Sequence, residues 1–287
     1  MELISKKEKM DIIRDITLED DFFFSKFLDG SNECVSLMLR IILGRNDLKV
    51  TKAETQKWMQ SVLSHSVRLD VYATDRDGNL YDIEIQKDNN GASARRARYY
   101  SAMIDAAALG KGAEYSSLPE TYVIFLTRED AIGHGKALYR IDRYLDGVWK
   151  PFGDGTHIVY VSSMLADEKT ELGRLMHDLR CANPAEMHYN VLRERLAYFK
   201  EITEGIEEMS NAFEDAMQRI VKEATQKARE ESLKEGKADG LEKGRTEGRQ
   251  EVARSMVADG SIPLSKIAKF SGLTLGEVES IKKSIQP

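Results

Sequence analysis

VRLDVYATDRDGNLYDIEIQ, residues 67–86, consists of two alternating segments around a short polar turn. Apolar side chains occupy every second position of each segment, and a period of two is the pattern of a strand with two different faces. The first segment should direct one set of apolar side chains to the core, namely Val67, Leu69, Val71 and Ala73. Its polar set includes Asp70, and that of the second segment includes Glu84 and Gln86. The sequence therefore predicts a β-hairpin with acidic residues on its polar face.

The turn DRDG at residues 75–78 sets the register of this hairpin. Asp at the first position and Gly at the fourth favour a type I turn, and Gly78 can take the left-handed conformation that closes a three-residue loop. Such a loop pairs the first turn residue with Asn79 and places Asp70 opposite Glu84, with Cβ atoms about 4.5–5.5 Å apart. A two-residue turn would shift the register by one and send the two carboxylates to opposite faces.

Two carboxylates opposite each other repel unless a cation lies with them. Mg²⁺ prefers oxygen ligands and usually takes one or two carboxylates together with substrate phosphate. Gln86 lies two residues beyond Glu84 and should project beside it. The alternative interpretation is a solvated polar face of an amphipathic hairpin, because acidic residues are common on the outer faces of antiparallel strands.

Two further segments join the hairpin in a recognisable pattern: TLEDDFFFSKF at residues 17–27 and RARYY at residues 96–100. Together with RLDVYA at 68–73 and GNLYDIEIQ at 78–86, they resemble the PD-(D/E)XK nuclease superfamily. More narrowly, the block is similar to the recombination-promoting nucleases, which are often labelled transposases. The resemblance extends to about residue 165.

The resemblance implies an α/β fold with a restriction-endonuclease-like core, in which helices flank a mixed central sheet. It also implies a Mg²⁺-dependent DNA endonuclease that hydrolyses phosphodiester bonds and is linked to DNA recombination. Mn²⁺ is expected to substitute for Mg²⁺. The alternative is a catalytically weak or inactive nuclease-fold protein that acts as an oligomeric DNA-binding or interaction module.

The resemblance also assigns roles to the hairpin residues. Asp70 matches the motif aspartate, Glu84 the acidic residue of the E-x-K element, and Gln86 the lysine position. Glutamine there departs from the superfamily consensus and lacks the positive charge of a lysine. The expected metal ligands are Asp70, Glu84 and the backbone carbonyl of Ile85.

An acid of the first helix joins the metal site in many nucleases of this superfamily. Asp20 and Asp21 are adjacent candidates, and we place Asp21 in the catalytic set, although the sequence does not choose between them. The alternative is that these acids only complement the positive end of the helix dipole. Thr17 is the expected cap of this helix, and Val35–Leu43 should form a second helix that stops at Gly44.

Basic residues follow the E-x-Q strand on a helix expected from about Ser93 to Leu109. On a helical wheel, one side carries residues that should pack on the sheet, namely Ala97, Tyr100, Ile104 and Ala108. The other side and the neighbouring strand supply the expected substrate contacts Arg68, Arg95, Arg98 and Tyr99. Further strands are expected within residues 53–63, at 121–127 and at 157–162.

The composition limits the class of protein. The net charge of −6 argues against broad electrostatic binding of nucleic acid, so DNA should bind locally and with strong salt sensitivity. The two cysteines provide no disulfide framework. There is no apolar signal segment and no run of 18 apolar residues, so we expect a cytoplasmic protein of bacterial type without a membrane span.

The chain should divide into a nuclease-like domain at 1–200, a helical segment at 201–258 and a small helix-turn-helix-like tail at 259–287. The helical segment carries an apolar stripe and then glycines at every fourth position from 236 to 248. It could pair with a second copy, giving a homo-oligomer such as a dimer, or dock on its own nuclease domain. A fraying, solvated helical linker is the alternative, because each glycine weakens a helix by roughly 0.8–1.0 kcal/mol.

Overall fold

A mixed β-sheet forms the centre of the first part of the chain. The structure is a computed structural model that describes residues 5–59, 66–87 and 91–285. The strands in these residues are β1 (Val50–Met59), β2 (Val67–Asp75), β3 (Leu80–Gln86), β4 (Thr121–Thr127), β5 (Leu138–Ile141) and β6 (Thr156–Ser162). Their order in the sheet is β1-β2-β3-β4-β6-β5. Strands β3, β4 and β6 run parallel, whereas β1, β2 and β5 are antiparallel to their neighbours.

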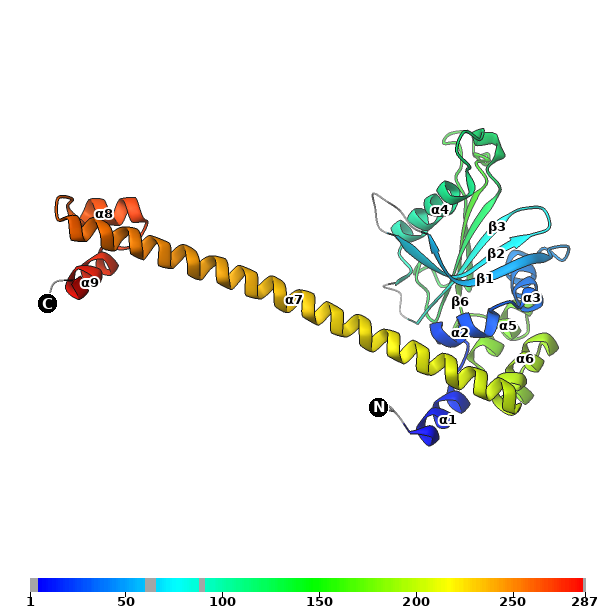
Figure 1. Cartoon of the computed structure of the whole chain (residues 1–287). Coiled ribbons are helices and arrows are strands. Elements are labelled where there is room, and N and C mark those ends of the chain that lie inside the picture. The colour runs from blue at the N-terminus through cyan, green and yellow to red at the C-terminus, as the bar shows by residue number, and fades with distance from the viewer. Residues whose placement is uncertain (1–4, 60–65, 88–90, 286–287) are drawn as a thin grey trace. The chain divides into compact units, whose positions relative to one another are not determined.

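Helices lie on both faces of this sheet (Figure 1). They are α1 (Lys6–Asp15), α2 (Asp21–Leu28), α3 (Asn32–Leu43), α4 (Ala94–Ala108), α5 (Glu171–Arg180) and α6 (Asn190–Glu201), with short 3-10 turns η2 (Tyr115–Ser117) and η3 (Pro184–Glu186). Helix α4 packs on one face through a cluster that includes Ala97 and Ile104. The helices α1, α2, α3, α5 and α6 contribute to a larger cluster on the other face. The expected mixed sheet with flanking helices is confirmed.

The hairpin has the register that the turn chemistry predicts. Val71 pairs with Ile83 and Thr74 with Leu80, a register that places Asp70 opposite Glu84. The backbone N–H of Asp75 donates to the carbonyl of Asn79, and Gly78 has a φ of 86°. A left-handed glycine closes the three-residue loop, because a residue without Cβ takes this conformation at little cost.

The strict alternation expected along the first hairpin strand is wrong. Val67 and Leu69 belong to the core cluster under α4, whereas Val71 and Ala73 belong to the cluster on the opposite face. The change of face occurs at Asp70, which the β1–β2 register places opposite Gln56. Gln56 has a φ of 52°, a left-handed conformation inside a strand. The local irregularity of β1 therefore accompanies a break in the pleat of β2.

The helix predictions are correct in part. Helix α3 ends at Gly44, which has a φ of 70°, as expected. Thr17 does not cap α2: Asp20 is the N-cap, and its carboxylate accepts from the backbone N–H of Phe23. In α4 the predicted inner side chains are buried except Ala108, which lies exposed in the last turn.

The expected strands at 121–127 and 157–162 correspond to β4 and β6. The strand expected within 53–63 corresponds to β1, and residues 60–63 of that expectation lie outside the described residues.

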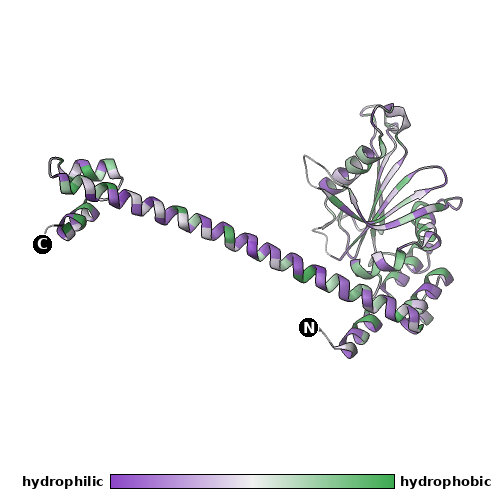
Figure 2. Cartoon of the chain, viewed as in Figure 1, coloured by the Kyte–Doolittle hydropathy of each residue, from purple (hydrophilic) through white to green (hydrophobic). Residues whose placement is uncertain are grey.

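A second unit follows the sheet domain, since contacts divide the chain into Met1–Ala216 and Met217–Pro287. Helix α7 (Thr203–Asp259) continues from the first unit into the second, where α8 (Leu264–Ser271) and α9 (Leu275–Ile285) follow. The end of α7 packs with both short helices through a small core around Ala253, Ile267 and Val278. Much of α7 is hydrophilic (Figure 2). None of the helices in the described residues is long and apolar enough to cross a membrane.

Candidate active site

Strands β2 and β3 exchange side-chain contacts where their regular pairing ends, beyond Val71 and Ile83. The backbone N–H of Asp70 donates to Glu84 Oε1 at 2.9 Å. The backbone N–H of Ile85 donates to Asp70 Oδ2 at 3.3 Å. Two carboxylates therefore take the place of ladder carbonyls between the strands, which fixes each of them against the backbone of the other strand.

Arg96 of α4 contacts the buried carboxyl group of Glu84. Its Nη2 donates to Glu84 Oε2 at 2.8 Å, and its Nη1 donates to the carbonyl of Gly91 at 2.8 Å. The guanidinium also lies over the ring of Tyr100, 4.8 Å from its centroid. The planar fork of arginine fits this arrangement, because it can serve two acceptors at fixed positions. Arg96 belongs to the basic cluster after the E-x-Q strand, and no sequence spacing distinguishes it there from Arg95 and Arg98.

Gln56 holds the other oxygen of Asp70. Its amide nitrogen lies 3.4 Å from Asp70 Oδ1 and 2.6 Å from the hydroxyl oxygen of Ser25 in α2. The left-handed backbone of Gln56 costs on the order of 1–3 kcal/mol, and such strain concentrates at functional sites. No sequence signal singles out Gln56, since a glutamine in a polar strand segment is ordinary.

The solvated-face interpretation of the hairpin is wrong. Asp82 and Glu84 are fully buried, and Asp70 is 8% exposed. Neither carboxylate oxygen of Asp82 has a hydrogen-bond partner in the described structure. Unpaired buried carboxylates are costly in the charged form. The polar side of this hairpin is therefore an acidic interior beneath α4.

The electrostatics of the acidic interior favour protonation. Burial raises the pKa of Asp70 to about 6, and the charge of Asp21 contributes to the rise. The N–H of Ile85 and the nearby arginines lower this pKa, but by less than burial raises it. Burial and the charge of Asp70 raise the pKa of Glu84 to about 8. Burial and the neighbouring acids raise the pKa of Asp82 well above its usual range. If all three carboxyl groups were ionised, their negative charge would exceed the positive charge that Arg96 supplies.

The structure gives Asp20 and Asp21 different surroundings. Asp20 caps α2 and accepts from Lys87 Nζ at 3.0 Å. Asp21 is exposed in the first turn, and its charge acts on Asp70. The carboxylate of Asp20 therefore already accepts hydrogen bonds from the start of α2 and from Lys87. Asp21 instead acts through its charge, which raises the pKa of Asp70.

Gln86 is half-buried and lies against Gly91. A Cβ atom at Gly91 would come within 1.8 Å of Gln86 Oε1. The backbone at Gly91 therefore approaches the glutamine amide more closely than a side chain at this position would allow.

The expected substrate contacts lie on the outside. Arg68, Arg95 and Arg98 are exposed, while Tyr99 is half-buried against the core cluster under α4. The three exposed guanidinium groups lie on β2 and in the first turns of α4.

The donor set suits a hard divalent cation, because it consists of carboxylate and carbonyl oxygens with a deficit of positive charge. In the described structure the carboxylate oxygens of Asp21, Asp70 and Glu84 do not converge into one compact group. The carboxylates that fit the ion are held instead by backbone N–H groups and by Arg96.

The comparison with protein families identifies a family for this chain. The profile of the PD-(D/E)XK nuclease family transposases matches residues 20–235, which is well over half of the chain. The comparisons with curated proteins and with solved structures each found no match. The matched region contains the acidic hairpin, α2 and Arg96, together with the mixed sheet that carries them. The chain belongs to the PD-(D/E)XK nuclease family transposases.

Proposed function

We propose that the chain is a Mg²⁺-dependent DNA endonuclease whose cuts feed recombination. The observation that carries the proposal is the buried pair Asp70 and Glu84, each held by a backbone N–H of the opposite strand, with raised pKa values and with Arg96 in contact with Glu84. Membership of a nuclease family supports the same chemistry.

Asp70, Glu84 and the carbonyl of Ile85 would hold the ion, and Asp21 would complete the set from α2. A divalent ion bound there would polarise the scissile phosphate and lower the pKa of a water molecule. Gln86 would orient the water or the phosphate through its amide. Exposed Arg68, Arg95 and Arg98, with Tyr99, would position the DNA backbone.

Arg96 would compensate for the glutamine at the lysine position. Its guanidinium already contacts Glu84, so it places a fixed positive charge beside the carboxylates without leaving its hydrogen bond to Gly91. A preorganised cation stabilises charge that develops during reaction, because no reorganisation is needed at that moment.

We also propose the division into a nuclease domain at 1–200, a helical segment at 201–258 and a tail at 259–287, with self-association through the C-terminal helices. The second candidate function is an interaction protein with weak or no cleavage. The glutamine at position 86 and the spread of the three acids favour it.

The test is cleavage of supercoiled plasmid by the full chain with Mg²⁺ or Mn²⁺. Asp70→Asn and Glu84→Gln should each lower the rate by at least about a hundredfold, while Glu114→Gln, an exposed acid outside the site, should cut normally. The ions should also raise the melting temperature of the wild type more than that of Asp70→Asn, because binding to the folded state stabilises it. Equal cleavage by all variants would reject the site, and DNA binding without cleavage would favour the second candidate.

A further inference from the structure

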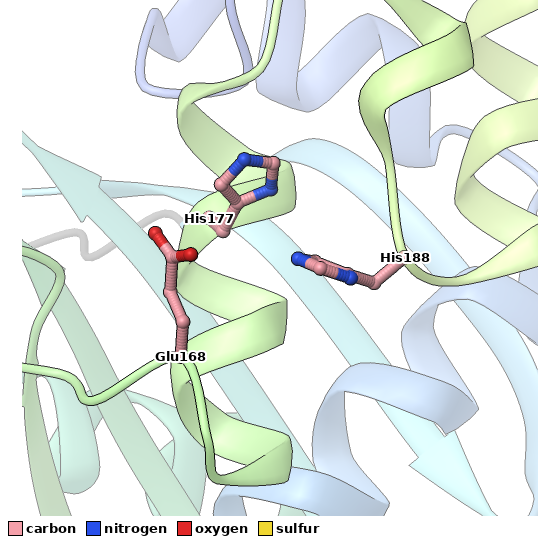
Figure 3. Close-up of side chains that lie close together, drawn as sticks. All are labelled: Glu168, His177 and His188. Carbon is pink, nitrogen blue, oxygen red and sulfur yellow. The ribbon is translucent and has the colours of Figure 1, made fainter.

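Two histidines and a glutamate gather around α5, on elements that do not belong to the acidic hairpin. Glu168 precedes α5, His177 lies on it, and His188 lies in the segment before α6. Each offers a ligand atom, and these atoms all lie within 4.8 Å of one another. Figure 3 shows the Glu168 carboxylate and the two imidazole rings close together, with the His188 ring extended toward the other two side chains. The side chains are exposed or half-buried, so an ion can reach them from solvent.

Asp178 contacts the ring of His177 and the backbone of His188. Its fully buried carboxylate accepts from the backbone N–H groups of His188 at 2.8 Å and Tyr189 at 2.9 Å. The same carboxylate lies 3.3 Å from Nδ1 of His177. A carboxylate on one imidazole nitrogen leaves the other nitrogen for a metal and fixes the ring orientation. The imidazole of His177 therefore has a carboxylate partner of the kind that orients metal-binding histidines, and Asp178 fixes the backbone at His188.

Competing contacts within the cluster are weak. Arg180 Nη2 lies 3.9 Å from Glu168 Oε1, and both side chains are solvent-accessible, so this ion pair contributes little. The two imidazole rings meet edge to face with centroids 4.7 Å apart. Neither contact binds the ligand atoms as tightly as a metal ion would.

We propose that Glu168, His177 and His188 bind a divalent transition-metal ion, with Zn²⁺ the preferred one. Two imidazoles and a carboxylate leave the fourth position of a tetrahedral site for water. Imidazole favours zinc, cobalt, nickel or copper, whereas Mg²⁺ favours oxygen ligands. The bound ion connects the segment before α5 with the segment before α6 and thus stiffens the connection between these helices.

The experiment is a titration of the metal-free full chain with Zn²⁺ and, for spectroscopy, with Co²⁺ in excess Mg²⁺. The wild type should bind one equivalent tightly and give the visible absorption bands of tetrahedral Co²⁺. His188→Gln and Glu168→Gln should weaken binding by at least about tenfold and remove the bands. His134→Gln, which changes an exposed histidine of another loop, should leave both unchanged.

Asp70→Asn separates this site from the proposed nuclease centre. It should keep the Zn²⁺ affinity and the Co²⁺ bands even if it abolishes cleavage. Loss of the Co²⁺ bands in Asp70→Asn, or equal binding by the wild type and His188→Gln, would overturn the proposal. Because His188 is exposed and its backbone N–H is retained in the variant, misfolding is not the expected cause of lost binding.

Discussion

Single side-chain contacts distinguish the carboxyl groups of the acidic interior from one another. Glu84 meets Arg96, Asp70 meets Gln56, and Asp82 has no hydrogen-bond partner for its carboxylate in the described structure. Three nearby acids with the same functional group therefore differ in their contacts and in their pKa values.

Arg96→Met should lower the free energy of unfolding of the metal-free protein by about 1.5–3 kcal/mol, the usual worth of a hydrogen bond to a charged group. The reason is that Glu84 loses its cation while it remains fully buried. Thermal or urea unfolding measures the change. Arg95→Met, at the exposed neighbouring position, should stay within about 0.5 kcal/mol of the wild type. Similar effects of both substitutions would contradict the assigned pair.

Gly91→Ala should slow plasmid cleavage by about 10–100-fold, because the new methyl group displaces the amide of Gln86. Stability should change little, since the end of a flexible side chain can move aside. Initial cleavage rates and melting temperatures measure the two effects. Gly110→Ala is the matched control, as its Cβ meets open space, and it should cut like the wild type. Unchanged cleavage by Gly91→Ala would remove Gln86 from the mechanism.

Asp75 should stabilise the hairpin turn only above its own pKa. Although burial opposes ionisation, hydrogen bonds from Tyr81 Oη at 2.7 Å and from Asn79 lower the pKa of Asp75. A lowered folded-state pKa gives stability that is present above the unfolded pKa of about 3.9 and is lost as the pH falls through the folded value.

Asp75→Asn should therefore cost about 1–3 kcal/mol at pH 7, and the difference from the wild type should shrink below pH 4. Urea unfolding over this pH range measures it. Asp77→Asn, in the same turn but with a half-exposed side chain, should show a much smaller difference at pH 7. A constant difference across the range would show that the charge of Asp75 is not the cause.

At the scale of elements, α7 is continuous through the glycine repeat. A Cβ atom at Gly236, Gly240, Gly244 or Gly248 would meet nothing within 4 Å. Within the described chain, no neighbouring element uses the close approach that these glycines allow. The row of four glycines is therefore either a solvated segment of the helix or a surface that packs against a second copy.

Replacing these four glycines with alanine, one after another, should stabilise α7 by about 0.8–1.0 kcal/mol at each step, because alanine restricts the unfolded chain and favours the helix. Helix content on heating, followed by circular dichroism, measures each step. Equal steps with unchanged light scattering would support the solvated segment. A destabilising step, or a loss of assembly, would show that the glycines pack against another copy.

For the whole molecule, the first part of α7 belongs to the sheet domain. Met209 is almost completely buried, and Phe213 meets Phe22 edge to face at 5.9 Å. Glu208 and Glu214 pair with Lys26 and Lys9 of the first helices. The compact unit accordingly extends to Ala216, beyond the proposed boundary at residue 200.

A chain that ends at 216 should be more stable than one that ends at 200 by about 2–5 kcal/mol, roughly the cost of losing a buried methionine and an aromatic pair. Urea unfolding of the two shortened chains measures this difference. Met209→Ala in the longer one should account for much of it. Equal stabilities would place the boundary at residue 200. Light scattering on the chain ending at 216 also tests assembly, since an oligomeric state equal to that of the full chain would exclude the C-terminal helices.

Local patterns predicted the elements for physical reasons that act over a few residues. The turn at 75–78 fixed the hairpin register because the left-handed glycine and the flanking aspartate select one loop length. The buried strand at 121–127 and the helix stop at Gly44 followed from apolar runs and from glycine in the same way. Thr17 failed as a cap because Asp20, three residues later, offers the carboxylate to the first turn of α2.

By itself, the sequence determined the hairpin, its register and the acids on its polar side, because turn chemistry and a period of two are local. Only the tertiary structure decided that this side is buried, that Arg96 contacts Glu84, and that Gln56 contacts Asp70. Those contacts depend on how α4 and β1 pack against the hairpin, and packing between distant segments leaves no periodic trace in the chain. Burial then sets the pKa values on which the proposed metal site depends.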